Sequence, residues 1–138
     1  MESAFTTPMP ILEVKTSKGN QLIVLVEILY LKADNKHSII YLANLTSVYT
    51  NHQLKWYEEK LPEPLFCRCH NSYMVNCLYV DCTCGNNAIL KVNNTYVPIS
   101  RDKMQYYKDN LALFKQHQAL HLLQNNAIHP NNMPVTLR

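Results

Sequence analysis

Glycine is scarce in this chain, which has two glycines among its 138 residues. A phosphate-cradling loop needs several glycines at fixed spacing, because its backbone has to approach the phosphates closely. The chain also lacks an apolar run of roughly 18 residues, the length of a membrane span, and its first ten residues lack the pattern of an export signal. We therefore expect a cytoplasmic protein with no glycine-rich nucleotide site, no membrane partner and no cofactor.

Excess charge is also small, with a formal net charge of +3 at pH 7. Such a balance permits a polyanionic partner without requiring one, since strongly basic nucleic-acid binders carry a denser patch. The placement of the basic residues is more informative, because many fall in or beside expected loops and strand ends, where side chains reach a ligand. These residues are Lys32, Lys36, Arg68, Lys91, Arg101 and Lys103.

The five cysteines are odd in number and belong to a chain without an export signal, which argues against a disulfide framework. Cys67 and Cys69, like Cys82 and Cys84, are separated by one residue, whereas zinc sites place two to four residues between paired ligands. Alternate strand residues share one face about 6.6 Å apart, so each pair fits two core thiols. Adjacent residues face opposite sides, so Cys69 and His70 cannot act as a nucleophile and its base. An enzyme is disfavoured, and a cysteine-based redox or metal-binding protein is kept as the alternative.

Runs of β-branched and aromatic residues, separated by turn-forming residues, predict short strands along most of the chain. Residues 17–20 form a glycine-containing turn that makes the first two strands a hairpin. The polar loop 33–37 places His37 at a loop end, and Asn93-Asn94 tolerates the positive φ of a two-residue hairpin turn. The expected strands span residues 11–14, 21–26, 28–32, 38–42, 66–69, 78–84, 88–92 and 95–99.

A short amphipathic helix is expected over Asn51–Leu61. Leu54, Tyr57 and Leu61 recur at spacings of three and four, which places them on one helical face. Asn51 is expected to cap the start, and Pro62 prevents continuation.

A second helix is expected after residue 100. Ser100 is the expected cap, and Arg101 therefore sits at a strand-to-helix corner. The apolar face of this helix comprises Met104, Tyr107, Leu111 and Phe114. Helical character is expected to continue through Leu123, whereas the Asn- and Pro-rich segment 125–134 is typical of a disordered tail.

The most specific stretch of the sequence is Phe66–Asn76, which reads Phe-Cys-Arg-Cys-His-Asn-Ser-Tyr-Met-Val-Asn. It resembles the F-x-R-x-H-x-S-Y-x-V-N signature of LytTR-type DNA-binding domains, the output domains of bacterial response regulators of the LytR/AlgR type. Further segments follow the family's order: upstream of the signature Ile28–Leu31 and the end of the expected helix, Glu58–Leu61, and downstream of it Val97–Arg101. The resemblance covers residues 11–112 and implies a mainly β, elongated fold of about ten mostly antiparallel strands with short helices and a C-terminal helix.

The resemblance also implies a transcription regulator that reads duplex DNA from loops inserted into the major groove. Its base-contacting positions fall on His37, Asn71 and Arg101. Their chemistry suits the task, because Arg pairs with guanine O6 and N7 and Asn with adenine N6 and N7, each pair giving about 1–3 kcal/mol of discrimination. Taken alone, each residue has an ordinary explanation: His37 as a solvated loop histidine, Asn71 as a turn residue and Arg101 as an ion-paired arginine. It is the signature that favours base recognition by the three residues.

Other residues of the signature and its surroundings are assigned supporting roles. His70 and Tyr73 are expected to hold the loop of Asn71, and Val75 and Leu78 to lie in the core. Phosphate contacts, which fix register and give salt-dependent affinity, are expected from Lys36, Arg68, Ser72, Lys91 and Lys103.

The length and apolar content of the chain suit one domain with one core. We expect an N-terminal extension at 1–10, the LytTR-like domain at 11–114, and a helical extension with a tail at 115–138. The module begins almost at Met1, so no receiver domain is expected before it, and residues 43–45 replace the family's usual glycine turn. Two copies are expected on repeated half-sites. The leucines of the extension could support self-association, although packing on their own core is favoured, and a protein-interaction module on the same fold is the further alternative.

Overall fold

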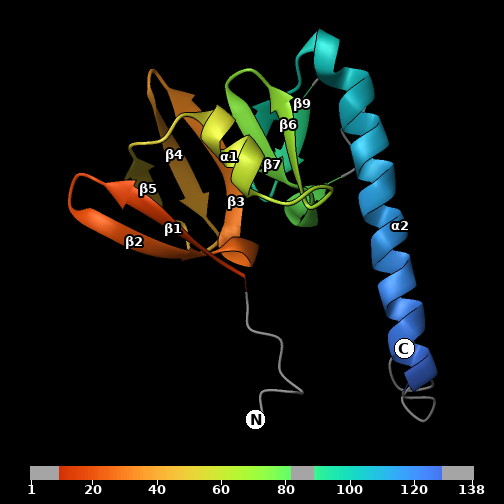
Figure 1. Cartoon of the computed structure of the whole chain (residues 1–138). Helices are drawn as coiled ribbons and strands as arrows, with labels where there is room; N and C mark the ends of the chain where they lie inside the picture. Colours follow the sequence, from red (N-terminus) through yellow and green to blue (C-terminus); the bar gives the residue numbers. More distant parts are fainter. Residues whose placement is uncertain (1–9, 82–88, 129–138) are drawn as a thin grey trace, which may run out of the picture.

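The computed structural model describes residues 10–81 and 89–128. Within these residues the chain forms ten strands, all paired antiparallel, two α-helices and short 3-10 helices. This confirms the mainly β architecture with a C-terminal helix (Figure 1). The strands are β1 (Ile11–Thr16), β2 (Gly19–Val24), β3 (Ile28–Asp34), β4 (His37–Leu42), β5 (Ser47–Thr50), β6 (Phe66–His70), β7 (Tyr73–Asn76), β8 (Val80–Asp81), β9 (Ile89–Val92) and β10 (Thr95–Pro98). The helices are α1 (Leu54–Lys60) and α2 (Met104–Ile128).

A five-stranded sheet in the order β5-β4-β3-β7-β6 forms the centre of the molecule. Its middle strand β3 is almost continuously apolar, and Ile28–Leu31 are all buried, as expected for a strand covered on both faces. One core lies under the β1–β2 hairpin and α1. It contains the three apolar residues that predicted α1, namely Leu54, Tyr57 and Leu61.

The start of α1 differs from the expectation. The helix begins at Leu54, with Gln53 at the cap position and no side-chain capping bond. Asn51 is instead held by β1, because its backbone N–H donates to the Lys15 carbonyl at 2.8 Å. A tertiary hydrogen bond therefore draws Asn51 out of the capping role that its residue type suggests.

Strand β7 was not expected from the sequence, although it lies next to the central strand. It pairs Tyr30 with Val75 and Lys32 with Tyr73. The expected strand 78–84 is wrong in its first residues, because Cys77–Tyr79 form a 3-10 helix and β8 begins at Val80. Val75 is fully buried as expected, whereas Leu78 is 45% exposed and is not a core residue. Residues 82–84 lie outside the described residues.

A second core lies between the β6–β7 side of the central sheet, the β10-β9-β8 sheet and the start of α2. Cys67 and Cys69 are fully buried there, as expected for core thiols, and burial raises the pKa of Cys69 to about 12. Cys82 and Cys84 lie outside the described residues. The helical face of α2 that closes this core contains Met104, Tyr107, Leu111 and Phe114, as the spacing predicted.

The outer part of α2 leaves the body of the protein. The helix starts beside the tops of β6 and β9 in Figure 1 and runs past the sheets. Phe114 is buried and is followed by an exposed stretch, 115–120. Leu120 is 50% exposed, so the expected packing on the core is wrong for this leucine, while the side chains of Leu122 and Leu123 lie outside the described part of the chain. The helix continues to Ile128, four residues into the segment expected to be a tail, while 129–134 lie outside the described residues. Neither helix in the described ranges is long and apolar enough to cross a membrane.

Candidate nucleic-acid interface

Three loops that are distant in the sequence meet at one end of the molecule. The Ala33 N–H, at the end of β3, donates to the Ser72 carbonyl at 2.8 Å, which joins the β3–β4 and β6–β7 turns. The Ser100 N–H donates to the Cys69 carbonyl at 2.9 Å, which attaches the β10–α2 corner to β6. Figure 1 shows all three at the top, where the β3–β4 and β6–β7 hairpins turn and α2 begins. The structure thus brings His37, Asn71 and Arg101 to the same end.

The turn between β3 and β4 is tighter than the sequence suggested. Only Asn35-Lys36 lie between the strands, and Asn35 takes the positive φ of 56° that a two-residue turn requires. His37 is therefore the first residue of β4 instead of a loop residue.

The imidazole of His37 is half-buried and held by two neighbours on β5. Its Nδ1 lies 3.2 Å from the Thr50 carbonyl, and its ring stacks on Tyr49 with the centroids 5.1 Å apart. A carbonyl only accepts, so Nδ1 carries the proton and Nε2 is the nitrogen left to meet a ligand. In the neutral ring Nε2 accepts a hydrogen bond, and donation to guanine needs the protonated ring. Sequence reasoning missed Tyr49 and Thr50, since their role depends on strand pairing.

Asn71 is exposed in the two-residue turn between β6 and β7. Within the described residues its side-chain amide has no hydrogen-bond partner, so both its donor and its acceptor are available. Its backbone carbonyl, in contrast, accepts from Nη2 of Arg68 at 2.5 Å. The turn is thus anchored through its backbone while the amide faces outward.

His70 holds this turn from the other side, as expected from the signature. Its Nδ1 accepts from the Ser72 N–H at 3.0 Å, which closes the backbone around Asn71. Tyr73 lies edge-on to the His70 ring with the centroids 5.8 Å apart and also contacts Tyr30. The signature residues around Asn71 therefore form a structural support.

Arg101 is exposed as the first residue of a 3-10 helix, Arg101–Lys103, that leads into α2. Its guanidinium makes no hydrogen bond or ion pair with any described residue. Ser100 occupies the cap position as expected, but its side chain makes no capping bond, and its buried Oγ has no partner in the described part of the chain. The position of Arg101 is set instead by the backbone bond from Ser100 to β6.

Some of the residues expected to contact phosphates lie beside the three loops, and one does not. Lys36 is exposed in the β3–β4 turn, and Ser72 and Lys103 are half-buried beside Asn71 and Arg101. Lys91 is different, because it pairs with Tyr96 and Asp81 near the Asn93-Asn94 turn, at the opposite end of the β9–β10 hairpin from Arg101. The structure does not bring Lys91 to the end that carries the three loops.

Arg68 is engaged within the protein. Its Nη1 forms an ion pair with Glu58 of α1 at 2.7 Å, and its Nε donates to the His70 carbonyl at 3.2 Å. The side chain is 17% exposed. A contact from Arg68 to a phosphate stays a prediction.

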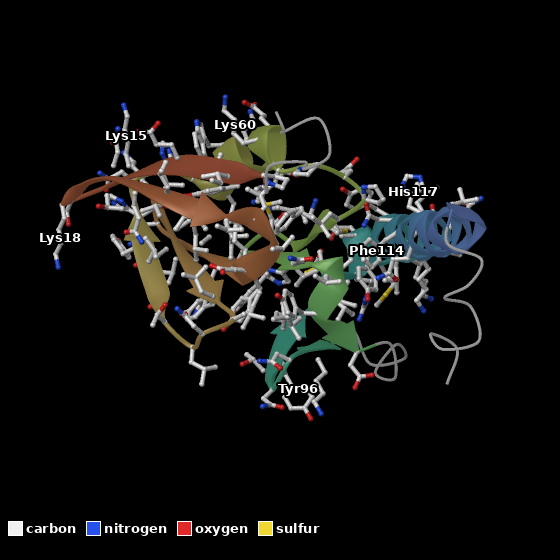
Figure 2. The ribbon with its side chains drawn as sticks, turned by 90° about the horizontal axis from the view of Figure 1, so that it is seen from below. Lys15, Lys18, Lys60, Tyr96, Phe114 and His117 are labelled. Carbon is white, nitrogen blue, oxygen red and sulfur yellow. The ribbon has the colours of Figure 1, made fainter. Side chains whose placement is uncertain are left out.

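Further lysines surround the β1–β2 hairpin and α1. Figure 2 shows Lys18 at the tip of this hairpin and Lys15 and Lys60 on one side of the molecule. Glu13, Glu58 and Glu59 are also exposed on these elements, so this side carries charge of both signs. It is a weaker candidate for a polyanion than the end with the three loops.

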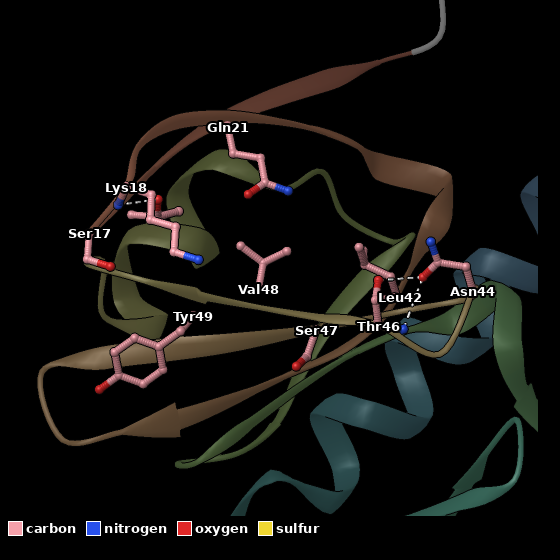
Figure 3. A pocket seen from close by; sticks show the side chains of 10 residues that line it. Ser17, Lys18, Gln21, Leu42, Asn44, Thr46, Ser47, Val48 and Tyr49 are labelled. Atoms are coloured by element: carbon pink, nitrogen blue, oxygen red, sulfur yellow. Dashed lines mark hydrogen bonds between the residues drawn. The ribbon is translucent and has the colours of Figure 1, made fainter.

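A pocket of about 400 Å³ lies along β5, between the β1–β2 tip and the β4–β5 turn (Figure 3). The Lys18 ammonium and the Gln21 amide lie over a floor formed by Leu42 and Val48. The lining contains no histidine, cysteine or carboxylate, and its titratable side chains are those of Lys18 and Tyr49. Nor do three His, Cys, Asp or Glu side chains come together as metal ligands among the described residues.

Comparisons with known proteins give a family match and a similar solved structure. The family model of the LytTr DNA-binding domain matches residues 19–112 of the chain. Among solved structures, the fold is similar to the LytTr DNA-binding domain of a Bacillus cereus protein described as a methyl-accepting/DNA response regulator. The two share 23% identity at a TM-score of 0.61, over 73% of this chain and 95% of that one. A comparison with curated proteins finds no matching sequence.

The family model covers more than half of the chain and includes all three loops of the interface. The solved structure independently supports the arrangement of the strands. This chain therefore belongs to the family of LytTR DNA-binding domains.

Proposed function

We propose that this chain, a DNA-binding domain of a transcription regulator by its family, reads base edges in the major groove of duplex DNA with His37, Asn71 and Arg101. The observation that carries the proposal is the meeting of three loops at one end, with two unpartnered reading groups. The Asn71 amide and the Arg101 guanidinium have no partner among the described residues, so neither has to break a protein contact to reach a base.

Each side chain offers a different hydrogen-bond pattern to the groove. Asn71 can pair with adenine N6 and N7, and Arg101 with guanine O6 and N7. The oriented ring of His37 presents Nε2 alone, because Nδ1 is held by Thr50. Three readers on separate loops would contact separate base pairs, which gives a short recognition sequence per copy.

Lys36, Ser72 and Lys103 surround these readers and are proposed to contact phosphates. Such contacts fix the register and make affinity depend on salt. We further propose that two copies bind repeated half-sites. We also propose the cytoplasmic location expected from the sequence, because a bacterial regulator of this kind meets its DNA in the cytoplasm.

Selection from a random duplex pool near physiological salt tests the proposal. The wild type is expected to enrich a motif of two spaced repeats. Asn71→Ala, Arg101→Ala and His37→Ala should each lose preference at one position of every repeat while the protein stays folded. Lys115→Ala is the matched control, since it removes an exposed charge from α2 without touching the three loops, and it should preserve the motif. Enrichment of no motif by the folded wild type would refute the proposal.

A further inference from the structure

The guanidinium of Arg68 lies between helix α1 and the turn that carries Asn71. Its Nη1 is 2.7 Å from Oε1 of Glu58, its Nε donates to the His70 carbonyl at 3.2 Å, and its Nη2 donates to the Asn71 carbonyl at 2.5 Å. One planar group therefore contacts a carboxylate and two successive carbonyls of the turn. Only arginine has donors arranged as a rigid fork that can satisfy such acceptors together.

These contacts complete a closed frame around Asn71. The next residue of the turn, Ser72, donates its N–H to His70 Nδ1 at 3.0 Å and accepts at its carbonyl from Ala33 at 2.8 Å. The backbone of the turn is thus held on the α1 side by Arg68 and on the β3 side by Ala33. The Asn71 side chain is left outside this frame.

The same contacts leave Arg68 poorly placed for a phosphate. Three of its five N–H groups are occupied, and its charge is paired with Glu58 in a partly shielded site, the Arg68 side chain being 17% and that of Glu58 39% exposed. A phosphate would have to compete with this carboxylate. Lys36, in contrast, is exposed in the β3–β4 turn.

We propose that Arg68, anchored by Glu58, is the positioning residue for Asn71 and sets base discrimination at the position that Asn71 reads. This inference rests on the proposed DNA-reading function. It assigns a role to Arg68 that differs from the phosphate contact expected from the sequence. Hydrogen bonds to two carbonyls fix the backbone of the turn and the Cα–Cβ direction of Asn71, from which its amide reaches a base for a bidentate contact.

Binding of the selected duplex and its single-base variants, measured across a salt series, separates the two roles. Asn71→Ala first identifies the base pair concerned. Arg68→Met, which keeps the length of the side chain without its donors, should reduce discrimination at that base pair by about fivefold or more. The other positions and the salt dependence should stay as in the wild type. The matched control Lys36→Met should instead lower the slope of log K against log salt by about 0.9 and leave base preference unchanged.

Arg68→Lys and Glu58→Ala extend the test if Arg68→Met lowers the melting temperature below the assay range. Lysine keeps the charge but lacks the fork, so Arg68→Lys should lose discrimination at the Asn71 position with an unchanged salt slope. Glu58→Ala removes a carboxylate from the exposed side of α1. It should reduce base discrimination at the Asn71 position by about two- to fivefold.

The proposal is overturned if Arg68→Met lowers the salt slope by about one phosphate contact, or if discrimination stays intact in folded variants. Equal loss at all positions would also overturn it, since a general loosening of the fold moves every contact. A wild type that selects no sequence would instead refute the DNA-reading function itself. The two failures are therefore distinguishable.

Discussion

Two asparagines of the signature, Asn71 and Asn76, are expected to respond in opposite ways to replacement by alanine. Asn76 is fully buried at the end of β7. Its Nδ2 donates to the Ile28 carbonyl at 2.9 Å, and its Oδ1 accepts from the Leu78 N–H at 2.9 Å, which caps the following 3-10 helix. Asn71 is exposed, and its side chain has no partner within the described residues.

The cost of Asn76→Ala follows from the two groups that lose their partner. The Ile28 carbonyl lies in a fully buried region, and an unsatisfied buried acceptor costs about 1–3 kcal/mol. The Leu78 N–H is closer to solvent, and loss of a capping asparagine costs about 0.5–2 kcal/mol. The free energy of unfolding should therefore fall by about 3 kcal/mol, a large part of the 5–15 kcal/mol typical of a domain. Asn71→Ala should change it by less than about 0.5 kcal/mol.

Urea unfolding followed by the fluorescence of Trp56 measures both changes. The midpoint should drop for Asn76→Ala with an unchanged slope, and stay near the wild-type value for Asn71→Ala. DNA binding, measured without urea, should be affected in the reverse order. Asn71→Ala should lose the preference for one base pair, whereas folded Asn76→Ala should keep it. The reasoning is refuted if Asn76→Ala costs less than about 1 kcal/mol, or if Asn71→Ala is equally destabilising.

Two other perturbations test the packing. Burial raises the pKa of the Cys69 thiol from 9.0 to about 12 and that of Cys67 as well, so both stay protonated in the folded protein after they ionise in the unfolded chain. The free energy of unfolding should therefore fall as pH rises from 9 towards 12, by about 1.4 kcal/mol per pH unit and thiol. Cys69→Ala should flatten this fall relative to the wild type, and equal slopes in pH-dependent urea titrations would contradict the assignment. Leu45 has φ of 71° and is 85% exposed, so Leu45→Gly should relieve left-handed strain and raise stability by about 0.5 kcal/mol after the entropy cost of glycine. A lower melting temperature for this variant would show that the leucine side chain makes a stabilising contact.

Local patterns predicted the elements whose determinants are local. The spacing of Leu54, Tyr57 and Leu61 predicted α1, and the Asn93-Asn94 pair predicted the β9–β10 turn, in which Asn93 has φ of 57°. Strand β7 escaped prediction because it has four residues and its apolar run Tyr73-Met74-Val75 lacks polar alternation. It pairs with β6 across a two-residue turn and with β3, a partner far away in the sequence.

The ends of the helices also depend on more than the local sequence. Asn51 has the residue type of a cap, but a hydrogen bond to β1 removes it from that position. At the other end, α2 continues through residues 125–128 in spite of their asparagines. Intrinsic preferences of single residues are small beside a continuing hydrogen-bonded helix or a tertiary contact.

What the sequence by itself determined is the family signature, the runs of β-branched and aromatic residues that form most of the strands, and the chemical types of the three proposed readers. Only the tertiary structure decided which polar residues are available and which are occupied. Asn71 and Arg101 keep their side chains unpaired among the described residues, whereas Arg68 is held by Glu58. The physical reason is that the deciding hydrogen bonds, from Ala33 to Ser72 and from Ser100 to Cys69, join segments distant along the chain. Such bonds form only when the strands have paired, so no local pattern contains them.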